Sequence, residues 1–137
     1  MGNRIGIYAL LYSLALVAPA RGDDTESAGL FGEALRLSVE MGDRGNVAYC
    51  LEGLAGIVVT ERKLEQAASL WGAAEPLLDG TEAVLYVHTP DRAVHAQAVA
   101  AARTRLDPVI WGNAWNNGRT MSLGQAVIYA LGRNTSG

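Results

Sequence analysis

Apolar residues recur at steps of three and four along most of this chain. In residues 63–78 they include Leu64, Ala67, Trp71, Ala74 and Leu78. Residues 46–60 and 26–41 carry similar stripes, with Val47, Leu51, Leu54 and Val58 in the first and Phe31, Ala34 and Met41 in the second. Such spacing places apolar side chains on one face of an α-helix. The pattern therefore predicts a helix over each of these three segments.

Helix-start signals divide the second half of the chain. Thr89-Pro90-Asp91 has the order of an N-cap, a first-turn proline and an acidic first turn, and Asp107-Pro108 repeats the cap and proline. Ser122 followed by Gln125 forms a capping box. We therefore expect helices within residues 90–132, and we expect the tail 133–137, which has no apolar residue, to be disordered.

No segment shows sustained alternation of apolar and polar residues. The nearest strand candidate is residues 83–87, which we interpret as a packed connector because a single strand has nothing to pair with. The predicted fold class is all-α, with about seven helices in a single domain over residues 1–132.

The apolar pattern repeats when the sequence is shifted by forty residues. The shift aligns Leu11 with Leu51, Leu14 with Leu54, Phe31 with Trp71 and Ala34 with Ala74. Large residues fall on large ones and small on small, as expected for helical hairpins that pack alike. We predict hairpins over about 4–41 and 45–78, with Phe31 and Trp71 in equivalent buried places and residues 90–132 as capping helices.

The residues of these hairpins resemble the tetratricopeptide repeat. The similarity lies in Leu51, Leu54, Ala55 and Val58 on the first helix and Ala67, Trp71 and Ala74 on the second. The longer period is similar to that of the extended repeats in the C-terminal arms of LuxR- and AfsR-type bacterial signal-transduction ATPases and transcription regulators. Residues 41–44 with 50–55, residues 67–75 and residues 114–126 resemble runs of those arms.

The resemblance implies an α-solenoid of hairpins that serves protein–protein interaction within a larger cytoplasmic regulator. The ATPase or DNA-binding module would lie outside these 137 residues. The chain departs from the family pattern at Thr60-Glu61-Arg62, where a glycine turn is usual, and at Ser27, where alanine is usual.

The N-terminal segment has a second interpretation. Arg4 precedes an apolar run, and Ala18-Pro19-Ala20 resembles a signal-peptide cleavage site, so residues 1–20 could instead be removed from a stand-alone exported helical protein. The run is shorter than the about 20 residues of a membrane-spanning helix, so we expect no membrane span. The register with residues 51–58 favours a first repeat helix.

Composition leaves few residues for catalysis. The chain has 11 basic and 14 acidic residues, and this acidic balance disfavours direct nucleic-acid binding. Cys50 lies on an apolar stripe, and the two histidines, His88 and His95, have no obvious carboxylate partners for a metal site. We expect no enzymatic activity, no catalytic residues, no cofactor and no metal.

The N-terminal helix carries the candidate interaction face. Ile5, Tyr8 and Tyr12 share one side of it, whereas Ile7, Leu11, Leu14 and Ala18 form the stripe that the repeat register assigns to the hairpin interior. The end of a solenoid normally carries a polar face. An apolar face here predicts either an upstream repeat of a larger regulator or a homodimer that pairs through this helix.

Overall fold

The structure is a computed structural model that describes residues 7, 10–12, 14–15, 24–78 and 92–132. Residues 10–12 and 14–15 are helical, and six further helices follow: α2 (Asp24–Glu40), α3 (Arg44–Thr60), α4 (Leu64–Leu78), α5 (Arg92–Arg103), α6 (Pro108–Arg119) and α7 (Leu123–Gly132). These described ranges contain no strand, so the predicted all-α class is confirmed. The strand candidate 83–87 and the tail 133–137 lie outside the described residues.

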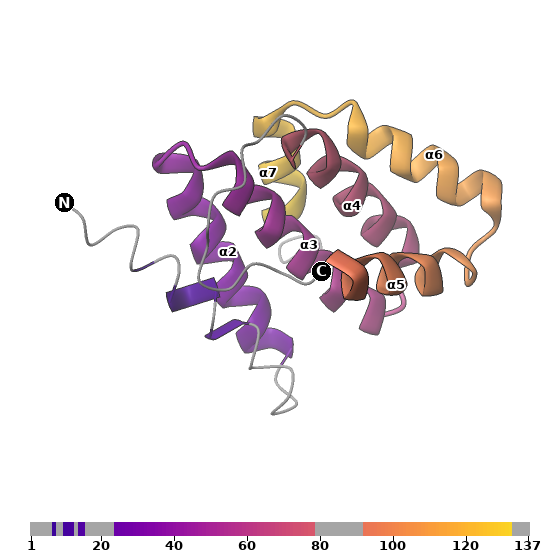
Figure 1. The fold of residues 1–137 in the computed structure, drawn as a ribbon, viewed down its shortest axis with the longest axis horizontal. Helices are drawn as coiled ribbons and strands as arrows, with labels where there is room; N and C mark the ends of the chain where they lie inside the picture. Colours follow the sequence, from indigo (N-terminus) through magenta and orange to yellow (C-terminus); the bar gives the residue numbers. More distant parts are fainter. Residues whose placement is uncertain (1–6, 8–9, 13, 16–23, 79–91, 133–137) are drawn as a thin grey trace.

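Helix α4 lies at the centre of the packing (Figure 1). It contacts α3 on one side and α6 on the other, and α3 in turn packs against α2. Helix α7 contacts both α2 and α4, so the C-terminal end of the chain returns to the first complete helix. Helix α5 is the most exposed of the six, since Ala102 is its one buried residue.

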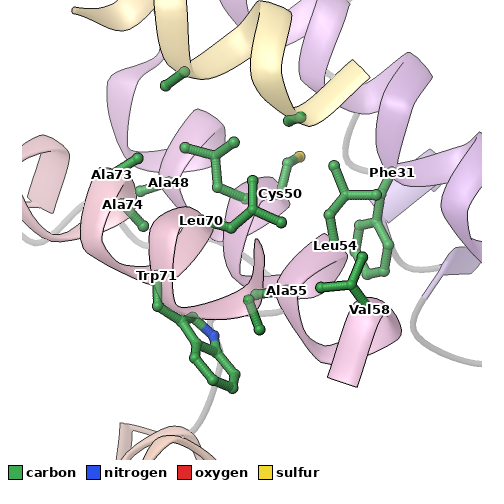
Figure 2. Packing of buried hydrophobic residues seen from close by; sticks show 14 of the residues in the cluster. Phe31, Ala48, Cys50, Leu54, Ala55, Val58, Leu70, Trp71, Ala73 and Ala74 are labelled. Carbon is green, nitrogen blue, oxygen red and sulfur yellow. The ribbon is translucent and has the colours of Figure 1, made fainter. Parts of the chain in front are cut away.

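The core is built mainly from α3 and α4, whose buried residues include Leu51, Leu54 and Leu70. Phe31 is 3% exposed and Trp71 is 4% exposed, which confirms that both are buried. Figure 2 shows Phe31 on one side of this cluster and Trp71 on the other. Burial of such large side chains is the main favourable term in folding.

The step of forty residues continues beyond the two hairpins found in the sequence. It takes Trp71 to Trp111 and Ala74 to Ala114, and both of these α6 residues are buried. The predicted repeat ended at residue 78, with residues 90–132 as caps. The forty-residue repeat of buried positions instead continues into α6, one helix further than predicted.

The turns after α2 and α3 have the same backbone geometry. Gly42 has φ 70° and Arg62 has φ 65°. In the first turn the Asp43 amide donates to the Ser38 carbonyl (2.9 Å), and in the second the Lys63 amide donates to the Val58 carbonyl (2.9 Å). Both are Schellman ends, in which a left-handed residue closes the helix. Arg62 therefore adopts the left-handed conformation in the turn where the sequence has no glycine.

Helices α4 and α6 approach each other through small residues. A side chain at Gly72 would overlap the Trp115 carbonyl, and one at Gly118 would overlap the Ser69 carbonyl. The Ser69 hydroxyl donates to the Ala114 carbonyl at 3.0 Å and joins the two helices. The absence of side chains at these two glycines is thus what brings the backbones together.

Candidate functional site

The predicted interaction face on the N-terminal helix must be corrected at Tyr12. Tyr12 is 5% exposed, and its ring meets that of Phe31 edge-on, with 5.5 Å between centroids. Burial raises the pKa of the Tyr12 phenol, so this residue belongs to the core. The assignment of Tyr12 to an open face is therefore wrong, whereas Ile5 and Tyr8 lie outside the described residues.

The same helix exposes different apolar residues. Ile7 is 47% exposed, Leu10 59% and Leu14 40%, although the repeat register assigned Ile7 and Leu14 to the interior. The buried positions are Tyr12 and Ala15. The helix is therefore rotated relative to the prediction, and its open apolar stripe is Ile7, Leu10 and Leu14.

A polar cluster that sequence reasoning missed joins α3 to α5. The Glu52 side chain is 8% exposed, and its two oxygens accept hydrogen bonds from the Arg92 guanidinium at 2.9 and 3.0 Å. His95 Nε2 lies 3.5 Å from Glu52 Oε2, and the His95 ring meets Trp71 edge-on. A charged residue inside the apolar run of α3 was the available signal, because a buried carboxylate requires a partner.

The charges of this cluster offset each other. The hydrogen bonds that Arg92 donates to the Glu52 carboxylate raise the pKa of Arg92. Burial lowers the pKa of His95; the Glu52 carboxylate acts in the opposite direction and the Arg92 guanidinium reinforces the lowering. His95 is therefore held neutral near pH 7, and the cluster behaves as a link that ties α5 to α3.

Cys50, the chain's single cysteine, lies inside the core. Burial raises the pKa of the Cys50 thiol, and its Sγ lies 3.7 Å from Asn46 Nδ2 inside the core. A thiol kept protonated is a poor nucleophile. The described part of the chain holds no group of three or more histidine, cysteine, aspartate or glutamate residues placed to bind a metal. His88 lies outside that part.

A groove bounded by α4, α6 and α7 lies on the surface of the described helices. It has a volume of about 360 Å³ and is lined by Glu65, Ser69, Ile110, Asn113, Ala114, Asn117, Met121 and Tyr129. A second hollow of about 510 Å³ shares Asn117, Met121 and Tyr129 and continues the lining along α7 to Gln125 and Ile128. The two hollows therefore form one surface, which we call the α6–α7 groove.

The α6–α7 groove combines apolar and amide side chains. Ile110 is 41% exposed and Ile128 73%, so both present aliphatic surface to solvent. Asn113 and Asn117 are exposed on α6, and each carboxamide carries both donors and an acceptor. Glu65 supplies a negative charge at the α4 edge. The groove can thus contact an apolar side chain, hydrogen-bond a backbone and attract a cation.

Comparison of the chain with protein-family models, with curated proteins and with solved structures finds no match. The chemistry of its own residues is therefore the guide to its function. In the described ranges, no helix is both long and apolar enough to cross a membrane.

Proposed function

We propose that this chain is a protein-interaction domain, a tetratricopeptide-like α-solenoid from a larger cytoplasmic bacterial regulator of the LuxR or AfsR type. It acts as a scaffold that holds a partner protein or the remainder of the regulator, without catalysis or a cofactor. The observation that carries this proposal is the α6–α7 groove, which is open, wide and lined by residues suited to peptide contact. The repeated placement of Phe31, Trp71 and Trp111 supports the repeat architecture.

The partner that fits the groove is a peptide segment of another protein or of the parent regulator. Ile110, Met121 and Tyr129 offer contacts to an apolar side chain. The carboxamides of Asn113 and Asn117 match the paired donor and acceptor of a peptide backbone. Glu65 favours a nearby lysine or arginine.

Selection from a library of displayed random peptides tests this assignment. Enriched peptides should combine an apolar residue with a lysine or arginine. Ile110→Glu should weaken their binding about tenfold or more, because it buries a charge in the groove. Val39→Glu is the matched control, since Val39 is 37% exposed on α2 and is not part of the groove lining. Equal loss in both variants, or no enrichment, would contradict the proposal.

The parent protein can be tested from the genomic sequence. A continuous reading frame upstream of Met1 that encodes a nucleotide-binding or DNA-binding module is the expected result. A stop codon in that frame directly before Met1, with no such module, would contradict the proposal that the chain belongs to a larger regulator. The peptide-binding proposal would then depend on the peptide selection alone.

The packing of residues 12 and 15 favours retention of the N-terminal segment over export. The Ser27 hydroxyl donates to the Ala15 carbonyl at 2.7 Å, and Tyr12 covers Phe31. Removal of residues 1–20 as a signal peptide would leave Ser27 and Phe31 without these contacts. Intact-mass analysis of the protein from a bacterial host should give the full-length mass, and loss of the first twenty residues would support the exported alternative.

A further inference from the structure

A second, smaller pocket lies between α5 and α6, apart from the α6–α7 groove. It has a volume of about 190 Å³ and is lined by Val99, Arg103, Trp111, Gly112, Trp115 and Asn116. Pockets for drug-sized ligands span about 300–1,000 Å³, so this one suits a ligand of one or two rings.

The floor of this pocket is a fixed aromatic surface. The Trp111 and Trp115 rings stack with 6.0 Å between centroids and 28° between planes. Trp111 is 4% exposed and also contacts Trp71, at 6.1 Å between centroids, so its orientation is set by the core. Indole faces held in this way stack favourably with a planar aromatic ring.

Open space above this floor results from a glycine. A Cβ at Gly112 would meet nothing within 4 Å, although the residue follows a buried tryptophan. A larger residue at Gly112 would project into this space without disturbing the helix packing.

The rim of the pocket carries a cation and an amide. The Arg103 side chain, in the last turn of α5, has no ion pair with any of the residues that the structure describes. Asn116 adds a carboxamide from α6. A guanidinium binds a carboxylate through two parallel hydrogen bonds, and the nearby indoles exclude water from one side of that contact.

We propose that the pocket between α5 and α6 binds a small planar aromatic carboxylate, whose ring stacks on the half-buried Trp115 beside Trp111 and whose anion pairs with Arg103. The pocket lies on the side of α6 that carries Asn116, whereas the peptide groove uses Asn113 and Asn117. The ligand can therefore bind whether or not the groove is occupied by a peptide.

Titration with 2-naphthoate, followed by nuclear magnetic resonance, tests the proposal. The chain has three tryptophans, so the indole N–H region should contain three signals that Trp→Phe variants assign. We expect the Trp111 and Trp115 signals to shift with a Kd of about 1 mM or lower. The neutral amide, 2-naphthamide, should bind about tenfold more weakly because it lacks the charge that Arg103 recognises.

Two variants with matched controls complete the test. Gly112→Leu should abolish the shifts by filling the pocket, whereas Gly56→Leu, at another helical glycine whose Cβ would meet nothing, should not. Arg103→Gln should remove the preference for the carboxylate, and Arg105→Gln should retain it. Absence of shifts at about 10 mM naphthoate, unchanged binding by Gly112→Leu or equal binding of the amide would overturn the proposal, and none of these results would bear on peptide binding at the groove.

Discussion

Glu52 and Arg92 form a two-pronged ion pair that connects α3 with α5 across forty residues of sequence. The carboxylate is buried, with 8% exposure, while the guanidinium side chain is 47% exposed. Because the two side chains differ in exposure, the removal of Glu52 and the removal of Arg92 should affect stability differently. Without Arg92, the charge of Glu52 would stay in the protein interior without compensation.

We predict that Arg92→Met lowers the free energy of unfolding by about 1–3 kcal/mol. This range is below that of a fully buried pair because Arg92 is partly solvated. Urea denaturation measures the loss, and hydrogen exchange should show faster opening of α5. The double variant Glu52→Leu, Arg92→Met should be more stable than Arg92→Met alone, since no buried charge remains. A double variant less stable than the single one would show that the ion pair is not the link.

The lowered pKa of His95 predicts acid sensitivity. Because the folded state binds this proton less tightly than the unfolded state, stability is fully present above the unfolded pKa of 6.5 and is lost as the pH falls through the lower folded pKa. Between about pH 7.5 and about pH 5, His95→Gln should therefore lose less stability than the wild type. Urea denaturation at several pH values measures the free energy of unfolding of both proteins. The same dependence of that free energy on pH in the wild type and in His95→Gln would contradict the prediction.

The two left-handed turns predict unequal effects of alanine. Gly42→Ala should lower stability by about 1–2 kcal/mol, because a side chain is placed where φ is 70°. Arg62→Ala should change it by less than about 0.5 kcal/mol, since a side chain already occupies that conformation. Thermal denaturation compares the two variants, and equal losses would show that backbone conformation is not the cause.

The close approach of α4 and α6 predicts that a single methyl group at Gly118 is harmful. Gly118→Ala should lower the free energy of unfolding by about 3 kcal/mol, the upper end for overpacking, because its Cβ meets the Ser69 carbonyl. Gly124→Ala is the control, as nothing lies within 4 Å of its Cβ. That variant should change stability by less than about 0.5 kcal/mol, because residue 124 lies in the first turn of α7, where helix propensity contributes little. Chemical denaturation of both would reveal whether backbone contact or propensity dominates.

Pairing of two copies through the N-terminal helix remains a prediction, now centred on the Ile7, Leu10 and Leu14 stripe. If this stripe drives self-association, light scattering should detect dimers of the wild type, and Leu10→Glu should reduce them by placing charge in the interface. Val39→Glu, an equally charged change elsewhere, should leave them unchanged. A monomeric wild type at high concentration would contradict the predicted dimer.

Much of the fold could be predicted from residue spacing. The segments 26–41, 46–60 and 63–78 agree with α2, α3 and α4 to within two residues, because their apolar stripes and end signals coincide. The orientation of the first helix could not be predicted in the same way. The shift of forty residues equates Tyr12 with Glu52, and both are buried, but the register alone gave no reason to turn a tyrosine inward.

The candidate site was less accessible to sequence reasoning. His95 was considered as a metal ligand with no partner, yet its neighbour is Glu52, which comes from another helix forty-three residues away. Likewise, Ile110 and Tyr129 lie on separate helices, and periodicity cannot show that they line one groove. Such relationships depend on how helices meet, which the pattern along one helix does not contain.

The return of α7 onto α2 has a consequence for cooperativity. In an open array of repeats, each unit touches its neighbours alone, and the ends can fray while the middle stays folded. Here the last helix contacts the first complete one as well as α4. Unravelling of α7 must therefore also uncover part of α2, so circular dichroism and tryptophan fluorescence should report a single, coincident unfolding transition.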